Sequence, residues 1–130
     1  MRLIKISLWL TVFYNLSAAA MLLFPSSGPG QSVGMPTEVP TIYLVTAAYF
    51  VLAFGGAYLW MALQDHVVRS LLYFGAFAKS GAFLMVWSLW ALGEVTTPSA
   101  ILVLGDAAFA VVWFTWLRKN PVNVSARTSA

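Results

Sequence analysis

Two charged side chains, Lys79 and Asp106, lie deep inside long apolar segments of this 130-residue chain. An ionisable side chain at the centre of a membrane helix costs about 2.5–3.5 kcal/mol to insert, so each is a candidate for function. For Asp106 three roles remain open: a structural polar network, a site for a ligand or a proton, and a contact with another protein. Asn15 and Tyr49 are expected at a similar depth, where they could donate hydrogen bonds to the carboxylate.

The role of Lys79 depends on whether its ammonium group stays in the apolar layer. A direct ion pair with Asp106 is disfavoured, because their α-carbons are expected to differ in depth by about seven residues, or ~10 Å along a helix axis. Each side chain should also lean towards the N-terminus of its own helix, which separates the two groups further. We expect Lys79 to snorkel, with its ammonium among the cytoplasmic head groups. A polar pocket and a partner subunit are the alternatives.

The composition excludes several kinds of reactive centre. The chain has no cysteine and a single histidine, His66, which lies in a short connecting segment. Disulfides, thiolate metal sites and covalently attached haem are therefore excluded. We expect no catalytic residues and no metal site, and we expect Glu38 and Glu94 to be solvated loop residues. The chain is thus more consistent with a non-enzymatic protein than with an enzyme.

Four apolar segments of about 18 to 23 residues must position these side chains, and helices of that length match the ~30 Å hydrocarbon core of a bilayer. With 61% hydrophobic and 8% charged residues, the chain has too little polar surface for a small soluble protein. We predict an all-α, four-transmembrane-helix up-down bundle that forms one domain over residues 1–130. The predicted helices are residues 3–24, 41–63, 67–92 and 98–117, with an irregular outer loop at 25–40 and a cytoplasmic tail at 118–130.

The basic residues predict how this bundle is oriented. The loops and termini that carry them alternate with two connections, 25–40 and 93–99, that contain no Lys or Arg. By the positive-inside rule, both termini and the middle loop face the cytoplasm of a bacterial inner membrane. We expect the first apolar segment to be an uncleaved helix rather than a signal peptide. The basic residues that predict this orientation are Arg2, Lys5, Arg69, Arg118, Lys119 and Arg127.

Tryptophan residues near the ends of the predicted helices are expected to anchor the bundle at the membrane interfaces. Indole rings are amphipathic and favour the boundary between hydrocarbon and head groups. The predicted anchors are Trp60, Trp113 and Trp116 on the cytoplasmic side, and Trp87 and Trp90 on the outer side. Between the interfaces, small residues four apart should allow helices to pack closely.

Several local features resemble the DoxX-like group of short bacterial four-helix membrane proteins. These features are Leu22–Pro25, Phe54–Tyr58, Lys79 and Gly105–Asp106. The resemblance implies a small membrane subunit associated with oxidoreductase or quinone-linked complexes. Because the chain has no cysteine, any thiol-based redox chemistry of such a relative is absent here.

The sequence favours a non-catalytic accessory or interaction subunit of a larger membrane complex. Its expected partners are membrane lipids and either other membrane subunits or further copies of itself. A lipid- or quinone-binding membrane protein and a small oligomeric transporter are the alternatives. We predict no cofactor, with a quinone or lipid as the alternative ligand. Nucleic-acid binding is not expected, because the basic residues form a rim at the membrane surface rather than a face that alternates with aromatic residues.

Overall fold

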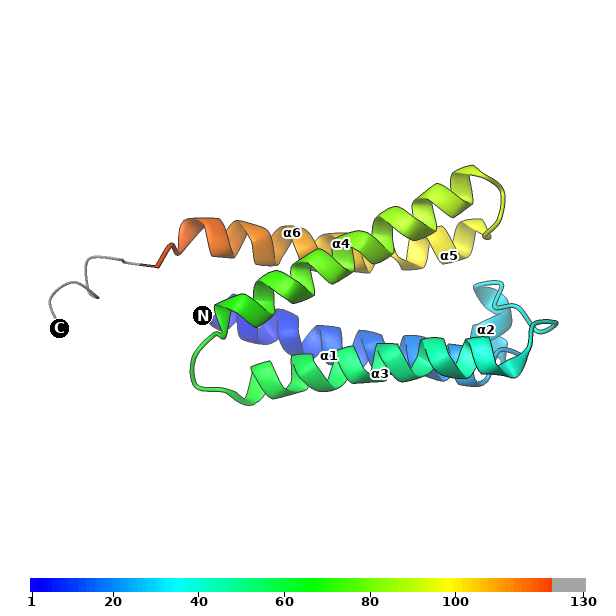
Figure 1. Cartoon of the computed structure of the whole chain (residues 1–130), viewed down its shortest axis with the longest axis horizontal. Coiled ribbons are helices and arrows are strands. Elements are labelled where there is room, and N and C mark those ends of the chain that lie inside the picture. The colour runs from blue at the N-terminus through cyan, green and yellow to red at the C-terminus, as the bar shows by residue number, and fades with distance from the viewer. Residues whose placement is uncertain (123–130) are drawn as a thin grey trace, which may run out of the picture.

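The computed structural model describes residues 1–122, which are helical apart from turns and short connections (Figure 1). Within these residues, four helices are long and apolar enough to cross a membrane. They are α1 (Arg2–Leu23), α3 (Thr41–Leu63), α4 (Arg69–Ala91) and a span made of α5 (Thr97–Leu102) and α6 (Leu104–Lys119). For residues 1–122, the prediction of an all-helical fold with four potential membrane spans is confirmed. Arg127 and the rest of the predicted tail beyond residue 122 lie outside the described residues.

The segment predicted as an irregular outer loop contains a short helix, α2 (Gly28–Ser32). The hydroxyl oxygen of Ser27 caps it by accepting a hydrogen bond from the amide of Gly30 at 3.2 Å. A Cβ atom at Gly30 would lie 2.6 Å from the carbonyl oxygen of Pro25, so the tight approach here requires glycine. The prediction of a wholly irregular loop was wrong, because its glycine, proline and serine residues also suit a capped turn of helix.

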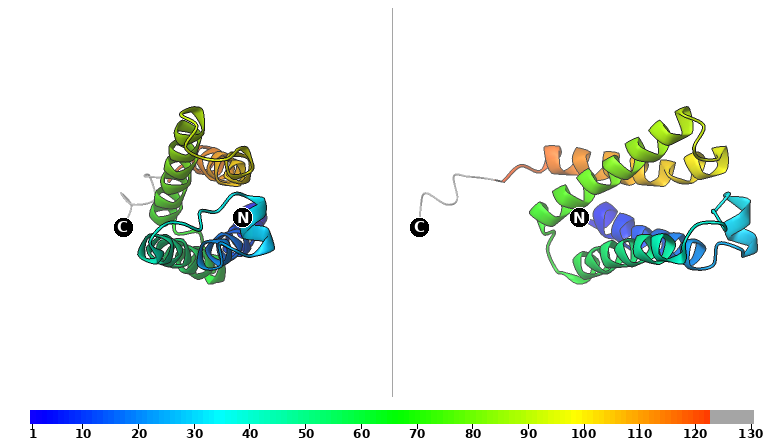
Figure 2. Two further views of the ribbon diagram at one scale, coloured as in Figure 1. Left: turned by 90° about the vertical axis from the view of Figure 1, so that its right-hand side faces the viewer. Right: turned by 45° about the vertical axis from the view of Figure 1, so that its right-hand side comes forward.

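The long helices form two closely packed pairs, α1 with α3 and α4 with α6, and the contacts between the pairs are sparser (Figure 2). Two basic side chains join helix ends within this arrangement. The amine of Lys5 donates to the carbonyl oxygen of Ala62 at 3.0 Å, and the guanidinium of Arg69 donates to that of Leu117 at 3.0 Å. Each cation thereby meets the partly negative C-terminal end of a neighbouring helix. The start of α1 and the end of α6 therefore lie at the same end of the molecule (Figure 1).

The core between the pairs is built around Trp113, whose side chain is fully buried. Its indole N–H donates to the hydroxyl of Ser7 at 2.8 Å, and its ring centre lies 5.3 Å from that of Tyr58. Gly75 makes room for both rings, since a Cβ atom there would lie 2.9 Å from a Tyr58 ring carbon. The prediction that Trp113 is an interface anchor was wrong. Its position along the helix suited an anchor, but it lies on the inward face.

The other predicted anchors lie nearer the surface of the protein. Trp60 is 56% exposed. Trp87 and Trp90 donate their indole N–H groups to acceptors in α5 at 3.0 and 3.1 Å, which joins the end of α4 to that helix. The ring of Trp116 lies 5.6 Å from the guanidinium carbon of Arg69, a distance typical of a cation–π contact.

Candidate functional site

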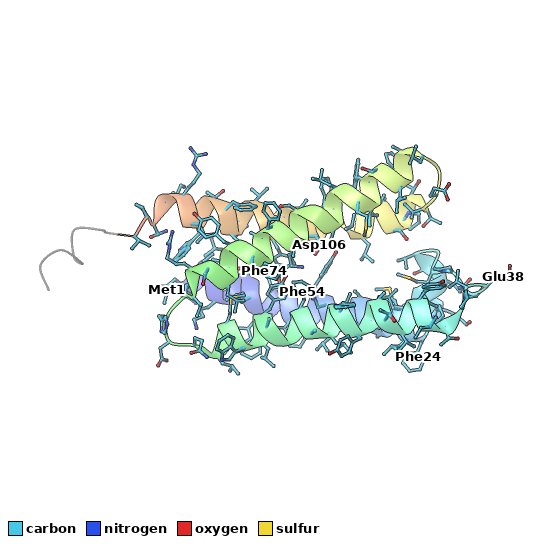
Figure 3. The ribbon with its side chains drawn as sticks, in the orientation of Figure 1. Met1, Phe24, Glu38, Phe54, Phe74 and Asp106 are labelled. Atoms are coloured by element: carbon cyan, nitrogen blue, oxygen red, sulfur yellow. The ribbon has the colours of Figure 1, made fainter. Side chains whose placement is uncertain are left out.

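The structure brings Lys79 and Asp106 together in a buried ion pair. Nζ of Lys79 lies 2.5 Å from Oδ1 of Asp106, and the two side chains are 5% and 14% exposed. Asp106 lies in the middle of the molecule, between the two helix pairs (Figure 3). The predictions that Lys79 snorkels and that the two residues do not pair directly were therefore wrong.

The two residues lie at more similar depths than their places in the apolar segments predict. The predicted separation counts Lys79 from the cytoplasmic end of its apolar segment and Asp106 from the outer end of its own. It also treats the two segments as equally long. Arg69, however, joins the start of α4 to the last turn of α6. Counted from that end, Lys79 lies ten residues after Arg69 and Asp106 lies thirteen residues before Lys119. The two positions therefore differ by three residues (13 − 10), or about 4.5 Å of helix rise, which the long side chain of Lys79 can span.

Aromatic rings surround the ammonium group of Lys79. Its Nζ lies 5.1, 5.2 and 5.3 Å from the ring centres of Tyr14, Tyr58 and Phe109, respectively. The face of an aromatic ring attracts a cation by about 0.5–2 kcal/mol, with the larger values at desolvated sites. The side-chain oxygen of Asn15, at 3.5 Å, is a further and weaker acceptor. The positive charge is thus balanced by groups of the protein itself.

Asn15 belongs to a line of polar side chains along one face of α1. Ser7, Thr11 and Asn15 are spaced four residues apart, and all three are buried. The amide of Asn15 donates to the carbonyl oxygen of Val51 at 3.0 Å and so ties α1 to α3. The hydroxyl of Thr11 has no hydrogen-bond partner within residues 1–122. Residues four apart share a helix face, so this spacing was a signal in the sequence that could have marked the inward side of α1.

Tyr49 does not join the site. Its side chain is 66% exposed, and its ring packs edge-on against Phe50 at 5.6 Å. The neighbouring Ala48 is 1% exposed. Successive helical residues point about 100° apart, since 3.6 residues make one turn, so a buried Ala48 turns Tyr49 outward. The predicted contact between Tyr49 and Asp106 was wrong.

Tyr14 takes the place predicted for Tyr49. Its hydroxyl donates to the carbonyl oxygen of Leu102 at 2.7 Å and lies 3.5 Å from Oδ2 of Asp106. The ring lies against Gly105, where a Cβ atom would be 2.7 Å from a ring carbon. Tyr14 is adjacent to Asn15 in the chain, and Gly105 is adjacent to Asp106. Nothing in the sequence, however, indicates that α1 and α6 meet at this level.

Two cavities meet at the ion pair. The outer cavity, of about 670 Å³, lies beneath the loops that contain Met35 and Glu94. The inner cavity, of about 360 Å³, has Lys79 in its wall. Tyr14 and Asp106 line both cavities. Cavities of roughly 300–1,000 Å³ are typical of small-molecule sites, so this space is large enough for a ligand.

The residues that line these cavities could bind a small molecule. No group of three or more His, Asp or Glu side chains within residues 1–122 could hold a metal ion. The outer cavity combines a mainly aliphatic wall with the carboxylate of Asp106 at its inner end. It can therefore accommodate an apolar body while hydrogen bonding to a polar end.

A comparison of the chain with known proteins finds no matching family, no matching curated protein and no matching solved structure. Any function must therefore be inferred from the geometry of the site, and the resemblance to the DoxX-like group stays a prediction.

Proposed function

We propose that this is a multi-pass membrane protein that binds an amphipathic small molecule, such as a quinone-class compound or a lipid, with the polar end of the molecule at Asp106. The observation that carries the proposal is the outer cavity, which reaches this carboxylate from beneath the outer loops. A concave, mostly apolar site with a few convergent polar groups is the usual form of a small-molecule site.

The ion pair itself supports a role in binding rather than in stability alone. Replacing a buried ion pair by apolar residues of similar volume is often neutral or stabilising, so a stable bundle does not need one. Charged side chains are rare within membrane-spanning helices, and those that occur commonly mark substrate or ion sites. Lys79 forms an ion pair with Asp106 at a point where two cavities meet.

We expect an amphipathic compound to co-purify with the protein in mild detergent and to be lost when the cavities are filled. Ala18 lines both cavities, so the Ala18→Phe variant should displace most of the compound. Ala20 lies on the same helix but is exposed, so Ala20→Phe is the matched control and should retain it. Mass spectrometry of the extracted small molecules measures the retained amount. A wild-type protein without an enriched compound, or a folded Ala18→Phe variant that keeps it, would contradict the proposal.

We further propose that the protein lies in a bacterial inner membrane as an up-down bundle with both termini in the cytoplasm. The positive-inside rule supports this orientation, because Lys5, Arg69 and Lys119 belong to the same end of the molecule. The absence of cysteine allows a clean test by single substitutions. A membrane-impermeant maleimide should label a Ser26→Cys variant in intact spheroplasts, and a Ser70→Cys variant only after permeabilisation. The opposite pattern would reverse the orientation.

An accessory role in a larger membrane complex is the second candidate. It is favoured by a shallow apolar pocket of about 200 Å³ between α3 and α4, where the rings of Phe54 and Phe74 stack at 5.8 Å (Figure 3). A side chain of a neighbouring membrane helix would fit a pocket of this size. A second membrane protein that co-purifies in a constant ratio would support this role, and migration as a lone monomer would count against it.

A further inference from the structure

We infer that the group bound at Asp106 is neutral and donates hydrogen bonds, as the hydroxyl of a hydroquinone, a phenol or an alcohol does, whereas a carbonyl or ether oxygen can only accept them. This inference rests on the proposed function and adds the chemical class of the head group. It follows from which polar atoms of the outer cavity still have hydrogen-bonding capacity.

The inner end of the outer cavity offers acceptors. Oδ1 of Asp106 is engaged by Lys79, and the nearest side-chain donor to Oδ2 is the hydroxyl of Tyr14 at 3.5 Å. A tyrosine hydroxyl has one proton, and here the carbonyl oxygen of Leu102 accepts it at 2.7 Å. Oδ2 is therefore left with unused lone pairs, and the hydroxyl oxygen of Tyr14 likewise offers only lone pairs to the cavity.

The side chains at the mouth of the outer cavity also offer hydrogen-bond acceptors. The hydroxyls of Thr96 and Ser99 both donate to the carbonyl oxygen of Val33, at 2.8 and 2.5 Å. Each hydroxyl has a single proton, so what remains for a ligand is again lone pairs. Glu94, which also lines the cavity, is an acceptor in its ionised form.

Four of the backbone N–H groups around the mouth are also engaged, whereas those of Val95 and Thr96 have no hydrogen-bond partner within residues 1–122. The N–H groups of Gly34 and Met35 donate to carbonyl oxygens of α2, and those of Gly93 and Glu94 donate to carbonyl oxygens near the end of α4. Pro36, another residue of the lining, has no N–H. Acceptors therefore outnumber donors in the outer cavity, and a ligand that brings its own donor would satisfy Oδ2 of Asp106.

The charge of Lys79 determines that the donor is neutral. Lys79 lines the inner cavity, and no Lys, Arg or His is among the residues that line the outer cavity. Because its ammonium lies 2.5 Å from Asp106, the pair has no net charge, and a second cation at Oδ2 would be repelled by the first. A hydroxyl group gains the hydrogen bond without this repulsion.

Para-heptylphenol and its methyl ether, para-heptylanisole, test the inference, because they share a ring and a tail and differ chiefly in the donor. We expect the phenol to bind the full-length protein in detergent micelles at least about tenfold more tightly, since hydrogen bonds to charged acceptors are worth roughly that much or more. Isothermal titration calorimetry measures both affinities. Binding of both probes must disappear in the Ala18→Phe variant, which places them in the cavity.

The Asp106→Asn variant makes the test sharper. Its side-chain oxygen can still accept from Lys79, which turns the amide NH₂, a donor, towards the cavity. The preference for the phenol should then disappear or reverse. Equal binding of the two probes by the wild-type protein, or an unchanged preference in a folded Asp106→Asn variant, would overturn the inference while leaving the proposed function intact. If neither probe binds the wild-type protein, the proposed function fails as well.

Discussion

Replacing Lys79 by Met is expected to destabilise the protein by about 3–5 kcal/mol, the range found when one partner of a buried ion pair is removed. The carboxyl group of Asp106 would then lie in the interior with no cation beside it, since Lys79 is the basic residue paired with it. Unfolding in mixed micelles with increasing denaturing detergent, followed by tryptophan fluorescence, measures the loss.

A double variant, Lys79→Met with Asp106→Leu, provides the control. Both charges are removed together, so no unpaired group remains, and most of the lost stability should return. The same double variant should fail to bind ligand, which would separate the role of the pair in binding from any role in folding. The buried pair would be contradicted if the stability losses of the single variants Lys79→Met and Asp106→Leu simply added up in the double variant. It would also be contradicted by a Lys79→Met variant as stable as the wild-type protein, which would restore the snorkelling interpretation.

The helical class and the four potential spans could be predicted because membrane insertion imposes a simple requirement on sequence. A segment must be about 20 residues long and almost wholly apolar, whatever it contacts. Thr41–Leu63 meets this requirement throughout its length, so its helix follows from hydropathy alone. The chain between Pro25 and Pro40 is not subject to the same requirement. There a local cap at Ser27 produced α2.

The composition of the site could be predicted less well, because lipid and protein interior are both apolar. In a soluble helix, polar residues mark the outer face, whereas a membrane helix is apolar on all sides and gives little indication of which face is inward. Tyr49 and Tyr14 illustrate the difficulty, since both are tyrosines at a similar expected depth and only Tyr14 faces the ion pair. Asp106 and Asn15 could be identified because a polar group that cannot reach water must face other polar groups.

Trp113 is another residue whose inward position could not be predicted from the sequence. Its replacement is the second change for which we expect a large loss of stability. The Trp113→Ala variant should lose about 3–5 kcal/mol of stability, the range observed for truncating a large buried aromatic side chain. In a membrane protein, little of this loss reflects transfer from water. It comes from the space left between Gly75, Tyr58 and α1, and from the hydrogen bond to Ser7.

Trp60 is the matched control for Trp113, because it has the same side chain but is 56% exposed, whereas Trp113 is fully buried. A truncated Trp60 leaves a space that lipid or detergent can fill, so Trp60→Ala should cost less than about 1 kcal/mol. If Trp113 were an interface anchor, the two variants would have similar effects. The same unfolding measurement therefore decides whether Trp113 packs between the helix pairs, and a large difference would show that the pairs are held together by aromatic packing next to the ion pair.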